Sequence, residues 1–442
     1  MQEIKKINLS LDIVTFKSAP IEIIDGDRGK NYPKQDEFTD EGYCLFLNAK
    51  NVTENGFNFD TKMFISEEKD NLLRKGKLQK GDVILTTRGT VGNVAFYSEH
   101  IPYNNIRINS GMLILRPKQE LDNEFLYWTL KSNYFKKQIY TFQSGTAQPQ
   151  LPISSLKHIE FYLPPINIQK KIVKILSQID NKIRILKYIN KNLQEQIETI
   201  YNSFFVYYDD FLKEELEECE IGFIPKDWNL MTLGQITTQI KEKVGKNNYK
   251  VFSAVNTGNL ILSEEYFDKQ VFSKSIEKYI VVKQDEFAYN PARINIGSIG
   301  RNDFDYEGCV SPVYVAFKVE EGYENFMNMF IKSKRFNQWV ITLSSGSVRQ
   351  TLNYNDFSII KIAYPPKSLV NKFNVIYESY YEVINYNKSV IHNLEEIRDT
   401  LLPKLMSGEI DVSKINCDLE LKYNYMKYLF NQIHTPMSKS VV

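Results

Sequence analysis

A chain of 442 residues is too long for a single comfortable hydrophobic core, so two or more domains are expected. Its 43% hydrophobic and 25% charged residues are the proportions of an ordinary globular protein, and no apolar run reaches the ~18 residues of a membrane span, which excludes one. The formal net charge of +1 neither supports nor excludes nucleic acid as a partner, because a DNA-binding protein need be basic on only one face.

The N-terminus has no apolar segment of signal-peptide length, so a cytoplasmic protein is expected. Four cysteines, Cys44, Cys219, Cys309 and Cys417, lie far apart without paired spacing. This distribution argues against a disulfide framework or a zinc site. We expect buried, reduced thiols.

Residues 1–163 are rich in aromatic and β-branched residues and contain frequent turn signals. Segments 82–87 and 111–116 predict short strands bounded by Gly, Asn, Asp or Pro. Segment 125–131 predicts a short helix. Together these elements predict a mixed α/β domain.

Residues 164–212 predict a long helix. The preceding Leu163-Pro164-Pro165 segment fixes the backbone before the helix, because proline is not accommodated inside one. Apolar residues then recur at alternating steps of three and four, the pattern of a coiled-coil helix. These positions are Ile172, Ile175, Ile179, Ile183, Leu186, Leu193, Ile197, Ile200 and Phe204.

The second half of the chain shows the same order of parts. Residues 213–364 predict a second mixed α/β domain, and residues 365–413 predict a second long helix after another double proline. Its apolar positions are Phe373, Ile376, Tyr380, Val383, Val390, Leu394, Ile397 and Leu401. Residues 414–442 form a C-terminal tail with a helical pattern between Leu419 and Ile433.

An internal duplication explains this similarity. An offset of 201 residues aligns 144–165 with 345–366 without a gap, and six of the 22 positions are identical. The same offset also pairs Lys131-Ser132 with Lys332-Ser333, Lys187 with Lys388, Asn192-Leu193 with Asn393-Leu394, and Glu195 with Glu396. Further upstream 82–92 resembles 285–297, with two extra residues in the second copy, as loops of duplicated domains commonly show.

Two helices with narrow apolar seams would most simply pack against each other. A helix of about 35–40 residues is ~50–60 Å long. Antiparallel packing would place the two mixed domains at opposite ends of this helical spacer. Asn190 and Asn387 fall on or beside the seams, where a buried Asn specifies register at some cost in stability. The fold class we expect is α+β: two tandem mixed α/β domains, each followed by a long helix, the helices pairing as an antiparallel coiled coil.

Motifs for catalysis are missing. The histidines at 100, 158, 392 and 434 lie far apart in the sequence, and there is no H-E-x-x-H or C-x-x-C. There is also no G-x-x-x-x-G-K-[ST] phosphate loop and no glycine-rich turn for a nucleotide or methyl donor. Asn290-Pro-Ala-Arg lacks the second proline and the aromatic residue of an amino-methyltransferase signature.

From these missing motifs we expect no catalytic residue, no metal and no cofactor in this chain.

Five segments carry a resemblance to a known family. Residues 163–183, continuing to 201–211, look like a central conserved helix and its aromatic exit. Ile221-Gly-Phe-Ile-Pro-Lys-Asp-Trp228 is similar to the opening of a recognition domain, and residues 401–412 look like the distal end of a second conserved helix. Arg88-Gly-Thr-Val-Gly-Asn93 resembles an Arg-rich turn. Over nearly its whole length the chain resembles the specificity (S) subunits of type I restriction-modification systems.

The resemblance implies a function for each part. Residues 1–163 and 213–364 would be target-recognition domains that each read one half of a split, asymmetric site in double-stranded DNA. The central helix 164–212 and the distal helix 365–413 would pair, set the DNA spacer length and bind two methyltransferase (modification) subunits. Whether a translocating restriction subunit also joins stays open. The tail 414–442 departs from the family pattern, and its role is open.

Candidate DNA-contacting residues follow from the chemistry of readout. Base edges are read by Arg, Lys, Asn or Gln, and arginine is scarce in this chain. The candidates lie in turn-rich parts of the two mixed domains or in the two Ser-Gly loops: Arg88, Arg107, Gln148, Gln150, Arg293, Arg301, Arg349 and Asn353. For any one of them the alternative is a surface salt bridge or a turn-capping side chain.

Two other functions remain open from the residues. A fused restriction-methylation enzyme has a similar recognition half, but it needs methyltransferase motifs that these 442 residues lack. A non-catalytic coiled-coil scaffold with two protein-binding domains is also compatible with the two helices.

Overall fold

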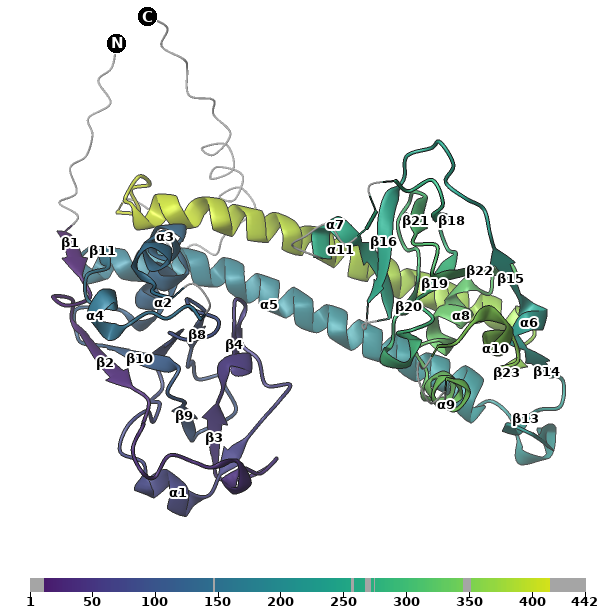
Figure 1. Cartoon of the computed structure of the whole chain (residues 1–442), viewed down its shortest axis with the longest axis horizontal. Helices are drawn as coiled ribbons and strands as arrows, with labels where there is room; N and C mark the ends of the chain where they lie inside the picture. The colour runs from purple at the N-terminus through teal and green to yellow at the C-terminus, as the bar shows by residue number, and fades with distance from the viewer. Residues whose placement is uncertain are drawn as a thin grey trace, which may run out of the picture. The chain divides into compact units, whose positions relative to one another are not determined.

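The computed structural model describes residues 12–145, 148–255, 258–266, 272–273, 275–344 and 351–413. The predicted tail 414–442 therefore lies outside the described residues. The chain forms two compact units (Figure 1). The first comprises the residues up to Leu186 together with those from Ser389 onward, and the second comprises Lys187–Lys388.

The first unit contains a four-stranded antiparallel sheet in the order β2-β10-β7-β8. Its strands are β2 Ile21–Asp25, β10 Met112–Pro117, β7 Val83–Thr86 and β8 Val94–Phe96. The same unit also contains a three-stranded sheet of order β6-β3-β9, formed by β6 Phe64–Ile65, β3 Cys44–Leu47 and β9 Ile106–Ile108. Two short pairs complete it: β1 Asp12–Thr15 with β11 Glu160–Leu163, and β4 Val52–Thr53 with β5 Gly56–Phe57.

The helices of the first unit are short apart from the long one. They are α1 Glu67–Leu72, α2 Asn123–Lys131, α3 Asn133–Phe142 and α4 Ile153–Leu156, with 3-10 turns at Gln35–Glu37 and Ala49–Asn51. Side chains from α2 and α3 pack with β7 and β10 into one core, which includes the fully buried Phe125, Leu85 and Leu115. Because β7 is buried on both faces, it is apolar throughout rather than alternating.

The second unit repeats this plan. Its four-stranded antiparallel sheet has the order β15-β22-β19-β20, with β15 Thr237–Ile240, β22 Val315–Val319, β19 Phe287–Tyr289 and β20 Ile299–Arg301. A second sheet of order β17-β16-β21-β18 contains β17 Asn259–Leu262, β16 Lys250–Val255, β21 Gly308–Val310 and β18 Ile280–Val282. The remaining strands pair as β12 Leu216–Cys219 with β13 Gly222–Pro225, and β14 Asn229–Thr232 with β23 Lys361–Tyr364.

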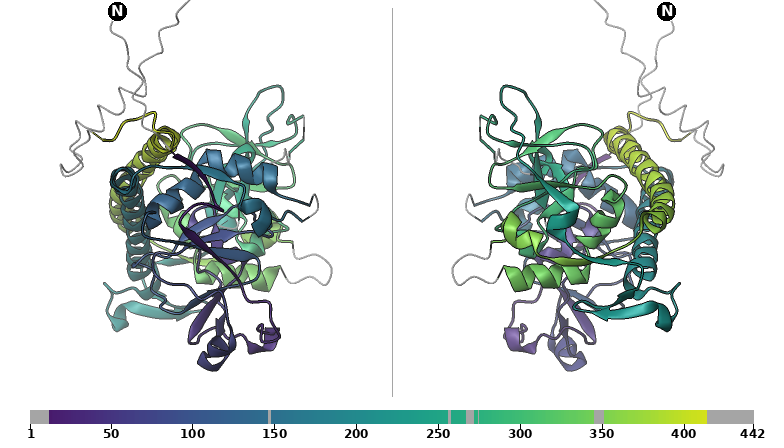
Figure 2. Two further views of the ribbon diagram at one scale, coloured as in Figure 1. Left: turned by 90° about the vertical axis from the view of Figure 1, so that its left-hand side faces the viewer. Right: turned by 90° about the vertical axis from the view of Figure 1, so that its right-hand side faces the viewer.

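The short helices of the second unit are α6 Leu233–Ile236, α7 Ser263–Tyr266, α8 Glu324–Phe330, α9 Lys334–Leu343 and α10 Tyr354–Ser358, with 3-10 turns at Lys213–Glu215 and Ile294–Ile296. In each unit, taken by itself, the strands lie to one side of the long helices (Figure 2).

Topology confirms the duplication. Strand order in the main sheet is the same in both units, and each contains a parallel pair, β3 with β9 and β16 with β21. The offset of 201 residues also relates the first residues of α2 and α8, of α3 and α9, and of β11 and β23. The fold is α+β, with two β-rich regions each followed by a long helix, as predicted.

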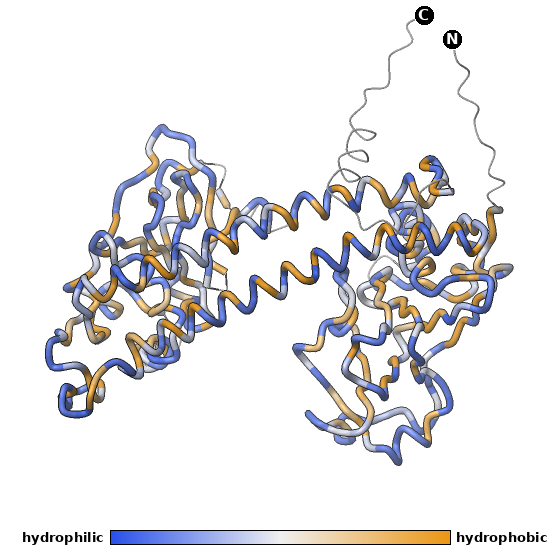
Figure 3. Tube along the Cα trace, turned by 180° about the vertical axis from the view of Figure 1, so that it is seen from behind, coloured by the Kyte–Doolittle hydropathy of each residue, from blue (hydrophilic) through white to orange (hydrophobic). Residues whose placement is uncertain are grey.

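The two long helices begin directly after the double prolines. They are α5 Ile166–Asn202 and α11 Lys367–Met406, of 37 and 40 residues. A π-helical turn, Ser203–Tyr207, continues α5 and ends at Tyr208, whose φ of 56° is left-handed. Apolar and polar residues alternate along both helices (Figure 3).

Contacts between α5 and α11 are antiparallel in each unit. In the first unit Arg398 pairs with Asp180 at 3.2 Å, and Lys171 donates to the carbonyl of Ser413. In the second unit Asn190 contacts Ile384 and Asn387. The predicted seam is buried at eight of its 17 positions: Ile172, Ile175, Ile179, Ile183, Leu186, Ile197, Phe373 and Leu401.

One predicted seam residue is wrong. Val383 is 46% exposed, whereas its neighbour Ile384 is fully buried together with Tyr377. Successive residues of a helix point about 100° apart, so only one of two adjacent apolar residues can face the partner helix. The heptad step from Tyr377 to Ile384 defines the actual seam.

The asparagines predicted to set register form a buried polar pair. Nδ2 of Asn387 donates to Oδ1 of Asn190 at 2.8 Å, and Nδ2 of Asn190 donates to the carbonyl of Ile384 at 3.3 Å. Because both side chains are buried, a shift of one helix along the other would leave their amides without partners. The pair therefore favours a single helix register.

We predict that Asn387→Leu destabilises the chain by about 1–3 kcal/mol, because Asn190 loses its buried donor. The double substitution Asn190→Leu, Asn387→Leu should recover most of that loss, since two apolar side chains leave no polar atom unsatisfied. Urea denaturation of the four variants in a double-mutant cycle measures the coupling. Asn385→Leu, at an exposed position on α11, is the control, and strictly additive effects of the pair would contradict the prediction.

Candidate nucleic-acid interface

The loop after α3 folds back onto the turn that contains Arg88. Ser144 and Gln150 exchange two backbone hydrogen bonds of 2.8 and 2.9 Å, and Gln150 also forms a β-bridge with Arg88. Arg88 and Gln148 are exposed, and Gln150 is half-buried. The structure thus brings three of the candidate DNA-contacting residues onto one surface of the first unit.

Gly145 allows this loop to close. Its φ is +88°, in the left-handed region, and a Cβ added there would lie 2.7 Å from the carbonyl oxygen of Gln148. Only glycine fits without strain. The Ser-Gly signal in the sequence therefore reports the shape of the loop that presents Gln148.

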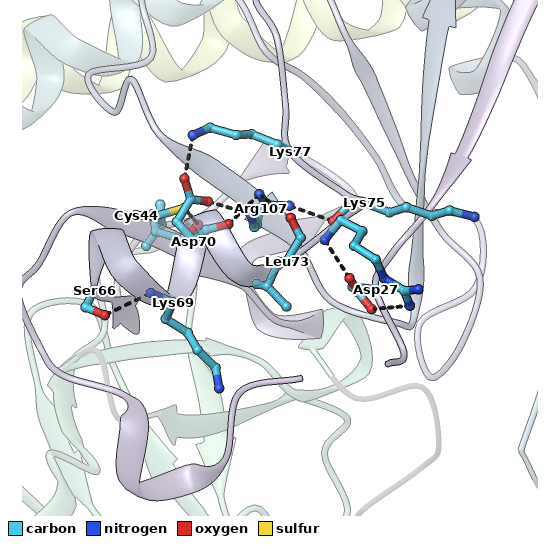
Figure 4. Close-up of polar contacts among 11 residues, drawn as sticks. Asp27, Cys44, Ser66, Lys69, Asp70, Leu73, Lys75, Lys77 and Arg107 are labelled. Atoms are coloured by element: carbon cyan, nitrogen blue, oxygen red, sulfur yellow. Dashed lines mark hydrogen bonds and ion pairs between the residues drawn. The ribbon is translucent and has the colours of Figure 1, made fainter. Parts of the chain in front are cut away.

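Arg107, by contrast, lies inside the first unit (Figure 4). Its side chain is 6% exposed, and its Nε donates to the carboxylate of Asp70. Its Nη atoms donate to the main-chain carbonyls of Asp70, Leu73 and Lys75 at 2.7–3.1 Å. Since the guanidinium is occupied and buried, we remove Arg107 from the candidate DNA contacts.

Asp70 anchors this buried cluster. Burial acts to raise the pKa of its carboxyl, but hydrogen bonds from Lys77 and Arg107 outweigh burial, so the net pKa lies below the ordinary value. The neighbouring Cys44 thiol is fully buried, and burial together with the Asp70 charge raises its pKa to about 12. Cys44 therefore stays a protonated thiol at neutral pH.

The cysteine prediction is confirmed for two of the four residues. Cys44 and Cys309 are buried and free, and burial raises the pKa of Cys309 to about 11. Cys219 is free and half-buried, while Cys417 lies outside the described residues.

Exposed cations gather on two neighbouring loops of the first unit, and we call this set the basic ridge: Arg28, Lys30, Arg74 and Lys75. Buried Asp27 joins the two loops, because its carboxylate accepts hydrogen bonds from the backbone N–H of Gly29 and of Arg74 at 2.7 and 2.8 Å. Asp27 thus holds the two loops together, and its Oδ1 also lies 3.7 Å from Nη2 of Arg74, while Arg28 pairs with Asp25 at 3.1 Å.

The basic ridge continues toward Arg88. Nη2 of Arg28 donates to the carbonyl of Ser110 at 3.2 Å, and the next carbonyl, that of Gly111, accepts from the backbone N–H of Arg88 at 3.2 Å. Gly26 permits the close approach, since a Cβ there would lie 2.2 Å from the carbonyl oxygen of Asn109. The basic ridge and the candidate DNA-contacting residues near Arg88 therefore lie on one continuous set of loops.

Reasoning from the sequence missed the basic ridge. A signal was present in Leu73-Arg-Lys-Gly-Lys77, where three cations follow one another within a turn. Its proximity to Arg28 depends on the long-range pairing that brings these loops together, and that pairing has no local signature. The scarcity of arginine favoured Arg107 as a candidate, although its guanidinium is buried and paired within the fold.

In the second unit Arg293 occupies the place of the Arg88 turn. The backbone N–H of Leu352 donates to the carbonyl of Pro291 at 3.0 Å, as that of Leu151 donates to Thr87 at 2.9 Å in the first unit. Arg293 is exposed. Arg349, another candidate DNA-contacting residue, lies outside the described residues.

Arg301 is buried and committed to the fold. Its side chain is 6% exposed, its Nε donates to Asp303 at 2.5 Å, and its Nη1 donates to Asn325 at 2.7 Å. Burial acts to lower the pKa of Arg301, but the charge of Asp303 outweighs it and the net pKa is raised. We therefore remove Arg301 from the candidate DNA contacts as well.

Asn353 is exposed but already has a structural role. Its Oδ1 accepts from the backbone N–H of Asp356 at 3.1 Å, and its Nδ2 donates to the Asp356 carboxylate at 2.5 Å. It caps α10, which was the alternative reading of this residue. Because both ends of its amide are already bonded to Asp356, Asn353 is a weaker candidate for contacting bases than Arg88 or Gln148.

Exposed lysines also gather in the second unit at the position that corresponds to the basic ridge. They are Lys241, Lys243 and Lys246, on the loop after β15, and Lys278. Hydrogen bonds from the backbone N–H of Val244 to Tyr279 and of Gly245 to Glu277, at 2.9 and 3.0 Å, tie this loop to the strand beside it. In both units, therefore, the loop that follows the first strand of the main sheet is basic.

Comparison with known proteins finds relatives in one family. Residues 21–195 match the family model described as type I restriction modification DNA specificity domain. The chain is 26% identical over 357 residues to the specificity subunit of the type I restriction enzyme MjaIX of Methanocaldococcus jannaschii, covering 76% of this chain and 79% of the relative. It is 23% identical to the HindI specificity subunit of Haemophilus influenzae, covering 87% and 98%. The chain is thus similar over most of its length to type I restriction-modification specificity (S) subunits.

A solved structure shares the fold of this chain. The crystal structure of the type I restriction-modification S subunit from M. genitalium has a TM-score of 0.54 and 19% identity, covering 92% of this chain and 99% of that one. At this identity the likeness concerns the fold.

The described residues of the chain contain no group of three or more His, Cys, Asp or Glu side chains placed to hold a metal ion. None of the helices in the described part of the chain combines the length and apolarity that a membrane-spanning helix requires.

We predict that Asp70→Asn destabilises the chain by about 3 kcal/mol at pH 7, because Arg107 and Lys77 lose the buried charge that compensates them. The folded-state pKa of Asp70 is depressed, so its contribution is present above the unfolded pKa of about 4 and is lost as pH falls through the lower folded pKa. The difference between the two proteins should therefore shrink below pH ~4.

Urea denaturation across this pH range measures the effect. Glu68→Gln, at an exposed position on the same helix α1, is the matched control and should change stability by less than ~0.5 kcal/mol. Equal stabilities of Asp70→Asn and the parent protein at pH 7 would show that the cluster is not an anchor.

Proposed function

We propose that this chain is the DNA sequence-reading subunit of a type I restriction-modification complex and that each β-rich region reads one half of a bipartite site. The recognition domains would be residues 1–163 and 213–364, joined by helices 164–212 and 365–413. The observation that carries the proposal is the duplicated topology, in which each copy presents exposed cations and polar side chains on equivalent loops. Two like readers in one chain suit a site with two separate halves.

Within each unit the contacts would divide by chemistry. Arg88, Gln148 and Gln150 carry planar donor and acceptor groups suited to base edges in the major groove, and Arg293 and Arg349 are their counterparts in the second unit. The basic ridge would neutralise phosphates and fix the orientation of the domain without reading sequence.

The long helices would bind the modification subunits. Ile185 on α5 is 48% exposed in the first unit, and Tyr386, its equivalent at the offset of 201 residues, is 71% exposed on α11 in the second. Exposed large apolar side chains on a helix are favourable for protein contacts. Two equivalent positions support the binding of two methyltransferase subunits, one to each unit.

Methyl transfer would then reside in the partner subunits, and this chain would supply only sequence recognition and spacing. The antiparallel helix pair is the natural spacer, since α5 alone is about 55 Å long at 1.5 Å per residue. The register set by Asn190 and Asn387 would keep that spacing fixed.

Footprinting of the chain purified with its modification subunit tests the proposal. Two short protected segments, separated by roughly one turn of DNA, are expected. A single continuous footprint, or binding without sequence preference, would rule out the split-site function. Binding of the modification subunit without any effect on DNA selectivity would instead favour a protein scaffold.

Variants in the first unit test the division of contacts. We predict that Arg88→Ala weakens binding to the cognate site by about 1–3 kcal/mol and relaxes selectivity at one base pair. Lys75→Gln should weaken cognate and unrelated DNA equally and reduce the salt slope by about 1. Lys118→Gln, an exposed lysine at the opposite end of β10 from Gly111, is the control. Equal effects of Arg88→Ala on cognate and unrelated DNA would remove Arg88 from base reading.

A further inference from the structure

One lysine recurs at the same structural position in both units. Lys131 and Lys332 each directly precede a serine that caps a ten-residue helix, α3 or α9. The two caps have identical geometry, with the serine Oγ accepting at 3.2 Å from the N–H three residues later. Capping accounts for the serine in each copy, but it does not involve the lysine.

Both lysines line a hollow in the surface. In the first unit the hollow has a volume of about 200 Å³ and includes Lys131, Lys136 and Gln143. In the second unit it has a volume of about 590 Å³ and includes Lys332 and Lys388. Each hollow therefore contains two ammonium groups that originate from different segments of the chain.

Neither repeated lysine is neutralised by the fold. Nζ of Lys131 contacts the hydroxyl of Tyr127 at 3.2 Å, and Nζ of Lys332 contacts Oδ1 of Asn259 at 3.3 Å. Among the described residues, no carboxylate lies within ion-pair distance of either ammonium. Lys131 is half-buried and Lys332 is exposed. A cation without a counter-ion in a surface hollow favours the binding of an anion.

The electrostatic surroundings agree with this. Burial lowers the pKa of Lys131 and of Lys332, and nearby cations, including Lys136 for the first and Lys388 for the second, lower it further. Asp180 and Asp303 act in the opposite direction without cancelling the effect. A bound anion would restore the ordinary pKa of each lysine by supplying the missing negative charge.

The acidic residues of the hollows leave room for that anion. The first hollow contains one glutamate, Glu54, against its two lysines. The second contains Glu198 and Asp303, but the Asp303 carboxylate already accepts from Nε of Arg301 at 2.5 Å and from the hydroxyl of Tyr381 at 3.1 Å.

The position of the first hollow points to the source of the anion. Val91, Gly92 and Asn93 line it, and they belong to the same turn as Arg88. An anion bound there would lie beside the side chains proposed to read bases. The phosphodiester backbone of DNA is the anion that accompanies bases at regular intervals, and each unit needs one such contact.

We propose that each hollow is a phosphate-binding site, in which Lys131 in the first unit and Lys332 in the second hold the DNA backbone; the repeated lysine is the position that the two linings share. The inference rests on the proposed DNA-reading function. It assigns Lys131 and Lys332 to positioning each recognition domain on its half-site, independently of the sequence being read.

The test uses the complex of the full chain with its modification subunit and measures DNA affinity as a function of salt. Lys131→Gln and Lys332→Gln should each weaken cognate and unrelated DNA by the same factor, about 3- to 10-fold, and each should reduce the slope of log affinity against log salt by about 1. The double variant should reduce the slope by about 2. Lys131→Arg and Lys332→Arg retain the charge and should retain the slope.

Lys137→Gln, exposed on α3 but outside the first hollow, and Lys334→Gln, exposed on α9 but outside the second, are the matched controls and should leave the slope unchanged. Unchanged slopes in both glutamine variants would overturn the inference. A parent complex without sequence-specific binding would overturn the proposed function itself, which separates the two failures.

A second arm distinguishes DNA from free phosphate. Inorganic phosphate is titrated against chloride at equal ionic strength, and thermal unfolding of the full chain is followed for the parent and the glutamine variants. Stabilisation by phosphate that disappears in the variants supports a phosphate site. If that stabilisation is seen while the DNA salt slopes do not change, the hollows bind free phosphate and the assignment to DNA is wrong.

Discussion

Antiparallel packing of α5 against α11 supplies the surface on which each β-rich region completes its core. The first unit buries Ile172, Ile175 and Ile179 from α5 in the same cluster as Leu401 and Leu405 from α11. The second unit buries Ile197 and Tyr201 from α5 in the same cluster as residues 370–384 of α11. Each fully buried aliphatic side chain contributes about 1.5–3 kcal/mol, so these shared clusters are a large part of what keeps each unit folded. A recognition domain cut from its helices would expose this apolar face.

The long helices thus also stabilise the loops that carry the candidate DNA-contacting residues. Because the first unit contains residues from both ends of the chain, its loops are held by contacts that close only when the last helix is in place. The polar pair of Asn190 and Asn387 restricts how the helices can slide, at a cost that an apolar pair would avoid. In the proposed function such a restriction would keep the spacing between the two DNA half-sites constant, because the helices could not slide along each other.

Charge is distributed in two ways within each unit. Some cations are buried and consumed by the fold, as Arg107 is by Asp70 and Arg301 by Asp303. Others stand on loops whose acids point inward, as Asp27 does beneath the basic ridge. A near-neutral chain can therefore present a basic surface without a basic composition. Lys131, which is half-buried, and Lys332, which is exposed, belong to a third kind, because neither has a carboxylate partner among the described residues.

The sequence by itself determined the α+β class, the duplication at an offset of 201 residues, the long helices and the positions of Asn190 and Asn387 on or beside their seams. These features are set by local periodicity, by proline and by self-similarity, all of which are properties of neighbouring residues. Only the tertiary structure decided that Arg107 and Arg301 are buried, that Val383 faces solvent in place of Ile384, and that Arg28 and Arg74 lie together. Burial and loop contacts depend on which distant strands pair, and a single sequence carries no local record of that pairing.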